Sequence, residues 1–154
     1  ICYQVGMSDK VETIENARVM HAWTLGDPDK VGMSVSPDHK DDDAFTLQLQ
    51  TVDDFCEVWS VDKVGIIKLD VDGYEYRVLR GAIETLRRDK PPILCEFSEY
   101  IQRLGESPKD FVNYIVSLDY KIVSMDGSFV CENWAQVAPC WPAHGSFDVM
   151  LLPR

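Results

Sequence analysis

The spacing of apolar residues changes once in the middle of the chain. Apolar side chains run almost without interruption over residues 64–69, which is typical of a strand covered on both faces of a parallel sheet. Over residues 78–86 they return at intervals of three and four, which is typical of an amphipathic helix. We therefore expect a buried strand that leads into a helix packed back on the sheet.

The segment after this helix completes a βαβ unit. Residues 87–90 carry positive charges that suit a helix C-terminus, and Pro91 and Pro92 stop the helix. Residues 93–97 then have the composition of a second buried strand. In open α/β sheets ligands bind outside the carboxyl ends of the strands, so polar residues at those ends are the first candidates for a site.

Similar signals place the remaining elements. Residues 51–54 have the form of a capping box, which predicts a short helix that ends near Val58. Ser107 and Pro108 predict the N-cap and the first turn of a helix that ends near Leu118. We expect a β-hairpin excursion within residues 20–50 and an irregular loop over residues 130–145. Further strands are predicted at residues 1–5, 45–50, 120–124 and 147–152.

Length and charge limit the organisation and the partners. The chain has 154 residues, which fits a single α/β domain over residues 1–154. Its formal net charge of -11 argues against binding to nucleic acid or to anionic membrane, so we expect a small-molecule partner. No apolar run approaches the roughly 18 residues that span a bilayer, and no leader is visible. Because the chain starts at Ile1, without Met and inside a predicted strand, we expect it to be a fragment that lacks upstream residues.

The cysteines are spaced without any C-x-x-C pair, so the sequence predicts neither a zinc knuckle nor a thioredoxin-like redox site. We interpret them as reduced thiols, and their odd number favours the cytoplasm. Cys131 and Cys140 flank a loop and could form a disulfide in an oxidising compartment. The five residues are Cys2, Cys56, Cys95, Cys131 and Cys140.

Three acidic residues follow the central strand. Asp72 can be the N-cap of the next helix with Glu75 as its capping-box partner, an arrangement that needs no function. Asp70 is not covered by that explanation. It lies on the same strand face as Lys68, so either Lys68 neutralises it or it points into a polar pocket, because a buried unpaired carboxylate is strongly disfavoured. We favour the pocket, which makes Asp70 a candidate for function.

Glu96 ends the next strand, and neighbouring parallel strands lie about 4.8 Å apart. We therefore expect Asp70 and Glu96 to meet at one edge of the sheet. Such a pair could hold a divalent metal, act as an acid and base, or bind an amino group. Of the histidines, His144 is the best candidate for chemistry because it precedes the last strand. Asp41 to Asp43 is interpreted as a solvated loop, since consecutive side chains splay apart.

The central residues resemble a known family. Residues 67–75 (IKLDVDGYE) and then 78–82 (VLRGA) are similar to the FkbM family of S-adenosylmethionine-dependent methyltransferases. Its members carry I-K-I-D-V-E-G-x-E followed by V-L-x-G-A, and Asp72 stands where Glu is usual. Weaker similarity extends over most of the chain. The family's Gly-rich cofactor loop has no counterpart, since no G-x-G occurs.

This resemblance implies a Rossmann-like class I methyltransferase fold, truncated at the N-terminus. Its sheet would be mostly parallel with an antiparallel last strand. The implied activity is O-methylation of a hydroxyl group on a sugar or natural product, with S-adenosylmethionine as the cofactor and no assigned metal ligand.

The resemblance also implies roles for individual residues. Asp70 and Val71 would contact the methionine end of the cofactor, and Ser8 and Asp9 would lie near the adenine. Glu96 would border the acceptor pocket, which makes Asp70 and Glu96 the expected catalytic residues.

Two other hypotheses remain from the sequence. The chain could be a non-catalytic or incomplete methyltransferase fold that binds a partner. Residues 66–73 also fit the apolar strand and D-x-D-G of haloacid dehalogenase phosphatases. That family places Thr soon after the glycine, whereas Tyr74 and Glu75 follow here.

Overall fold

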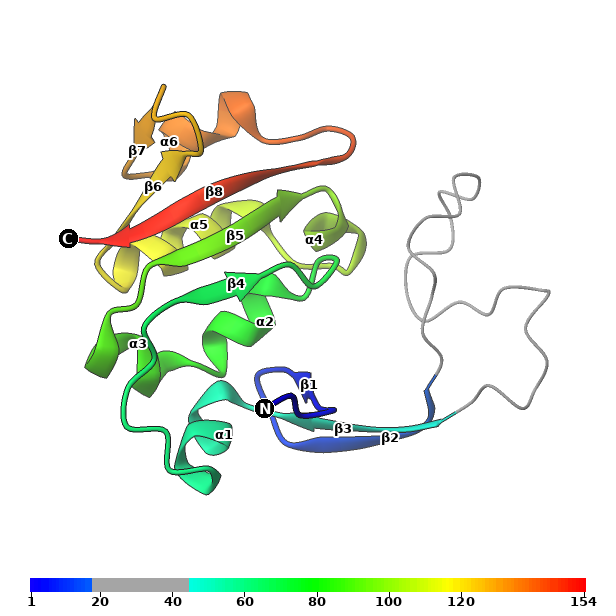
Figure 1. The fold of residues 1–154 in the computed structure, drawn as a ribbon. Coiled ribbons are helices and arrows are strands. Elements are labelled where there is room, and N and C mark those ends of the chain that lie inside the picture. Colours follow the sequence, from blue (N-terminus) through cyan, green and yellow to red (C-terminus); the bar gives the residue numbers. More distant parts are fainter. Residues whose placement is uncertain (18–44) are drawn as a thin grey trace.

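The computed structural model describes residues 1–17 and 45–154, and within these ranges the strands form two sheets. The larger sheet has the strand order β4-β5-β8-β6-β7, and the smaller has the order β1-β3-β2. Figure 1 shows the smaller sheet beside the β4 side of the larger one, next to the N-terminus. Most of the predicted excursion, residues 18–44, lies outside the described residues, and so do the acidic run 41–43 and two histidines, His21 and His39.

The larger sheet is mixed rather than mostly parallel, so that prediction is wrong. β4 and β5 pair in parallel, as the βαβ prediction requires. The last strand, β8, lies between β5 and β6 and runs antiparallel to both, and β7 is antiparallel to β6. The antiparallel last strand is therefore confirmed within an α/β fold of mixed sheets. The bounds are β4 Ile67–Leu69, β5 Ile93–Ser98, β6 Tyr120–Ser124, β7 Val130–Cys131 and β8 Ser146–Pro153.

The smaller sheet contains the predicted strand at residues 45–50 and two short strands that were not predicted. β2 (Glu12–Ala17) and β3 (Phe45–Gln50) are antiparallel, and β1 (Gly6–Met7) runs parallel to β3. The strand predicted at residues 1–5 is wrong, because only Gly6 and Met7 reach β3. The preceding residues leave the sheet, and the ring of Tyr3 instead contacts Trp59, with ring centroids 4.3 Å apart.

The helices follow the sequence signals where a capping residue is present. The Thr51 hydroxyl accepts a hydrogen bond from the Asp54 N–H at 2.9 Å, and the Ser107 hydroxyl accepts one from the Asp110 N–H at 3.2 Å. Both predicted N-caps are thus confirmed. The predicted irregular loop contains short elements, β7, α6 and η2, and α4 was not predicted. The bounds are α1 Val52–Val58, α2 Glu75–Arg80, α3 Ile83–Asp89, α4 Tyr100–Arg103, α5 Pro108–Ser117, α6 Trp134–Val137 and the 3₁₀ helix η2 Ala138–Cys140.

The central helix is divided into α2 and α3, which corrects the prediction of a continuous helix. The backbone of Gly81 passes so close to Ser8 that a Cβ at Gly81 would lie 2.1 Å from the Ser8 carbonyl oxygen. Helix α3 is capped by a side chain of α1. The Asp53 carboxylate accepts hydrogen bonds from the N–H groups of Glu84 at 3.0 Å and Thr85 at 2.8 Å. The break is caused by packing that the local sequence does not encode.

The core lies between the larger sheet and one layer of helices. In β5, Ile93, Cys95 and Phe97 are buried against α2, α3 and α5. The near face of the sheet in Figure 1 carries no helix of the described residues. The prediction that the central strand is covered on both faces is therefore wrong for this part of the chain. Ile66 remains 66% exposed, and Lys68 is exposed on the same side.

Candidate functional site

Three carboxylates lie in a row at the carboxyl end of β4 and β5. Leu69 of β4 pairs with Cys95 of β5, so the next residues, Asp70 and Glu96, come at the same level on neighbouring strands. In the next strand, Asp148 of β8 is the direct partner of Glu96. The structure thus brings Asp70 and Glu96 to one edge, as the sequence predicted, and adds Asp148. The antiparallel register that places Asp148 there could not be inferred from the sequence.

The carboxyl group of Glu96 has a raised pKa. Partial burial raises its pKa, a hydrogen bond with the Ser146 hydroxyl lowers it, and the negative charges of nearby aspartates raise it again. One oxygen, Oε2, is buried and has no hydrogen-bond partner. An unpaired buried carboxylate oxygen is costly, so it marks a position where a ligand or a proton would be stabilised. The aspartates that raise the pKa are Asp70, Asp72 and Asp148.

Asp70 is bound to Lys68 by a short ion pair on the open face of the sheet. The two side chains are 45% and 61% exposed, respectively. Of the two alternatives left by the sequence, the structure shows the neutralising lysine rather than a buried pocket. The Asp70 hydrogen bond is the main reason that the pKa of Lys68 is raised, and Asp148 and Glu96 add to it. Lys68 therefore lies in the field of the whole acidic row.

The capping box predicted for Asp72 and Glu75 is wrong. Helix α2 begins at Glu75 with Tyr74 at the N-cap position and no side-chain cap. Asp72 instead has a φ of 51°, in the left-handed region of the turn before the helix. Glu75 is fully buried, and its Oε1 accepts a hydrogen bond from the Val71 N–H at 3.0 Å. Its carboxyl group therefore binds the loop in front of the helix.

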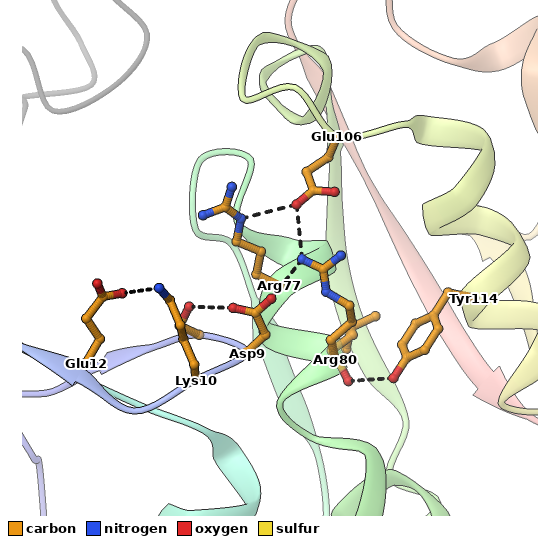
Figure 2. Close-up of polar contacts among 9 residues, drawn as sticks. Asp9, Lys10, Glu12, Arg77, Arg80, Glu106 and Tyr114 are labelled. Carbon is orange, nitrogen blue, oxygen red and sulfur yellow. Dashed lines mark hydrogen bonds and ion pairs between the residues drawn. The ribbon is translucent and has the colours of Figure 1, made fainter.

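Ser8 and Asp9 follow β1, and Figure 2 shows Asp9 between the smaller sheet and Arg80 of α2. The Ser8 hydroxyl donates to Asp9 Oδ1 at 3.3 Å, and Asp9 Oδ2 accepts from Arg80 at 2.9 Å. Arg80 also binds Glu106 at 3.1 Å, which in turn binds Arg77 at 3.2 Å. Both side chains predicted to lie near the adenine thus already contact protein groups, and their role toward a cofactor stays a prediction.

A family model, the methyltransferase FkbM domain, matches residues 1–122. The chain belongs to the FkbM methyltransferase family. The match spans β4, the acidic loop after it, β5 and Glu96, so the residues of the acidic row before β8 lie within the family region. No curated protein and no solved structure matches this chain.

The FkbM match identifies residues 66–73 as part of a methyltransferase domain, and it gives no support to the phosphatase hypothesis. Within the described parts of the domain, no group of three or more His, Cys, Asp or Glu residues is arranged to hold a metal ion. His144 has a side chain that is 92% exposed, with Nδ1 3.7 Å from Glu99 Oε2, so it lies on the surface rather than in the acidic row.

Two further observations bear on the sequence predictions for this FkbM domain. All five cysteines are free thiols, including Cys131 and Cys140, so the disulfide considered for these two is absent from the structure. No helix of residues 1–17 and 45–154 is long and apolar enough to cross a membrane.

Proposed function

We propose that this FkbM domain takes part in the transfer of a methyl group from S-adenosylmethionine to a hydroxyl group of a small molecule, a sugar or another natural product. The family membership supports methyl transfer. The single observation that supports a site for it is the buried, unpartnered Oε2 of Glu96 within the acidic row. A free carboxylate oxygen next to the other carboxylates of the acidic row suits both the binding of a cationic cofactor and the removal of a proton.

The residues of the acidic row fit the charge of this cofactor. S-adenosylmethionine carries a sulfonium and an ammonium group, both positive, and when bound it supplies an electrophilic methyl group. The acidic row would offer this cofactor three carboxylates, those of Asp70, Glu96 and Asp148. Among the described residues, Lys68 is paired with one of them, Asp70. Asp70 and Val71 would hold the methionine end, and Ser8 and Asp9 would lie at the adenine end. This excess of negative charge would stabilise the bound cation.

Glu96 has the environment expected of a general base. With S-adenosylmethionine bound as the methyl donor, the Glu96 carboxylate would accept the proton that the acceptor hydroxyl loses when it is methylated. Burial and neighbouring aspartates raise the pKa of Glu96, which makes it a better proton acceptor than an ordinary carboxylate. Much of the remaining acceleration would come from holding the two reactants in line.

Calorimetric titration of the chain with S-adenosylmethionine tests this proposal. We expect saturable binding that weakens in Glu96→Gln and Asp70→Asn, with S-adenosylhomocysteine as a competing ligand. Incubation with candidate hydroxyl compounds, followed by mass spectrometry for an added methyl group, would then identify the acceptor. A folded chain that fails to bind the cofactor would contradict the proposal and favour a non-catalytic binding module with the methyltransferase fold.

The proposal includes a cytoplasmic location and a small-molecule partner. The free thiols fit a reducing compartment, and the net charge of -11 disfavours nucleic acid and anionic membranes as partners.

A further inference from the structure

Glu75 is a buried acid that accepts a hydrogen bond from the loop between β4 and α2. Its side chain has no exposed area, and it is the first residue of α2. A carboxylate at this position normally stabilises the helix N-terminus, yet the N-cap residue here is Tyr74 and no side chain caps the helix. The carboxyl group instead reaches back to the Val71 N–H, 3.0 Å from Oε1. Burying a carboxyl group is unfavourable, and no helix cap compensates for it here. We therefore look for the role of Glu75 in the loop that it binds.

The loop that Glu75 binds is tightly wound. The Tyr74 N–H donates to the Val71 carbonyl oxygen at 3.2 Å, which closes a turn. Inside that turn Asp72 and Gly73 have φ values of 51° and 101°, a region that few residues adopt without support. Burial raises the pKa of the Glu75 carboxyl, and hydrogen bonds from the amides of Val71, Glu75 and Gly73 lower it.

The other side of the loop rests on α4. Gly73 lies so close to this helix that a Cβ on it would be 2.8 Å from the Tyr100 carbonyl carbon and 2.9 Å from Leu104 Cδ1. The loop is therefore held at two points, by the contact of Gly73 with α4 and by the hydrogen bond of Val71 to Glu75. Asp70 directly precedes Val71, so the second contact determines the backbone at the end of β4.

We propose that Glu75 is a positioning residue, whose carboxyl oxygen fixes the Val71 amide and thereby the backbone that carries Asp70. The consequence for cofactor binding rests on the proposed function, because that function places Asp70 and Val71 at the methionine end. This positioning role needs an oxygen that can accept a hydrogen bond from the Val71 N–H, and it does not need a negative charge. Glu75→Gln keeps such an oxygen, and Glu75→Leu has a similar volume without it.

Hydrogen exchange of the Val71 amide, measured by NMR, tests the structural part. We expect this amide to be protected in the wild type and in Glu75→Gln, and to exchange about 10- to 100-fold faster in Glu75→Leu. Glu84→Leu is the matched control, because the Glu84 side chain is 75% exposed on α3. An unprotected Val71 amide in the wild type would overturn the inference even if Glu75→Leu does not fold, and so would equal exchange in a folded Glu75→Leu.

Calorimetry with S-adenosylmethionine on the same proteins tests the consequence. We expect Glu75→Leu to bind about 10-fold more weakly, while Glu75→Gln and Glu84→Leu retain affinity. Full affinity in Glu75→Leu together with a mobile Val71 would overturn the positioning role. A wild type that does not bind the cofactor but shows the expected pattern of exchange would refute the proposed function and support the assignment of Glu75 to the loop.

Discussion

At the scale of single residues, Asp70 and Asp72 have different surroundings. Asp70 lies beside Glu96 and binds Lys68, whereas Asp72 is exposed in a left-handed turn and caps nothing. We expect Asp70→Asn to weaken binding of S-adenosylmethionine about tenfold, because it removes a charge from the acidic row. Asp72→Asn should leave both affinity and stability nearly unchanged, since Asn tolerates positive φ as well as Asp does.

Calorimetry and urea unfolding of this matched pair provide the measurement. A large loss of stability in Asp72→Asn would contradict the exposed position of Asp72 in the turn. Equal affinities in the two variants would remove Asp70 from the cofactor site.

Glu75 also makes stability depend on pH. Burial raises its pKa above the usual value of 4.5, so the folded state keeps a proton that the unfolded state releases. The free energy of unfolding should therefore fall as the pH rises from about 4.5 through the raised folded value. Glu75→Gln should make this decline shallower, although the raised pKa of Glu96 leaves part of it. Urea unfolding between about pH 4 and pH 8 measures the slope, and an unchanged slope would contradict this assignment.

At the scale of elements, the break between α2 and α3 depends on Gly81. We expect Gly81→Ala to destabilise the fold by at least about 2 kcal/mol, because its Cβ would meet the backbone oxygen of Ser8 and neither chain segment can yield cheaply. Gly65→Ala is a suitable control, since nothing lies within 4 Å of a Cβ there. It should change the free energy of unfolding by less than about 0.5 kcal/mol. Similar urea midpoints for the two variants would contradict the close approach of the Gly81 backbone to the Ser8 carbonyl oxygen.

Elements with local signals could be predicted from the sequence. Thr51 and Ser107 cap α1 and α5 because an N-cap needs only residues within one turn. The division at Gly81 and the cap that Asp53 gives to α3 depend on chain segments about 30 residues apart or more, so no local pattern contains them. The mostly parallel sheet was what the family resemblance implied, and strand composition does not encode the position of β8 between β5 and β6.

The same limit explains the candidate site. Asp70 and Glu96 could be paired from the sequence, because the carboxyl ends of parallel neighbours meet at one edge. Asp148 joins them through the antiparallel register of β8. Glu75 was assigned to a helix cap because its spacing from Asp72 fits one. Its burial and its hydrogen bond with the Val71 N–H, which indicate a different role, are visible in the structure alone.

At the scale of the whole molecule, Arg80 connects three parts of the chain. Its guanidinium binds Asp9 next to the smaller sheet and Glu106 between α4 and α5 (Figure 2). It also lies 4.5 Å from the centre of the Tyr76 ring. The side chains of Arg80, Asp9 and Glu106 are 33%, 29% and 18% exposed, so solvent screens these contacts less than on an open surface. A single side chain thus ties the smaller sheet to the helical layer of the larger one.

We expect Arg80→Met, which keeps the aliphatic stem, to lower the free energy of unfolding by about 1–2 kcal/mol, because Asp9 and Glu106 each lose a partner. Arg87→Met is the control, since Arg87 is 63% exposed and lies 3.7 Å from Glu84. Its effect should stay below about 0.5 kcal/mol. Added salt should only slightly reduce the difference in the free energy of unfolding between Arg80→Met and Arg87→Met, because a partly buried network is weakly screened. Equal urea midpoints would mean that the smaller sheet is held to α2 by Gly81 and Ser8 rather than by charge.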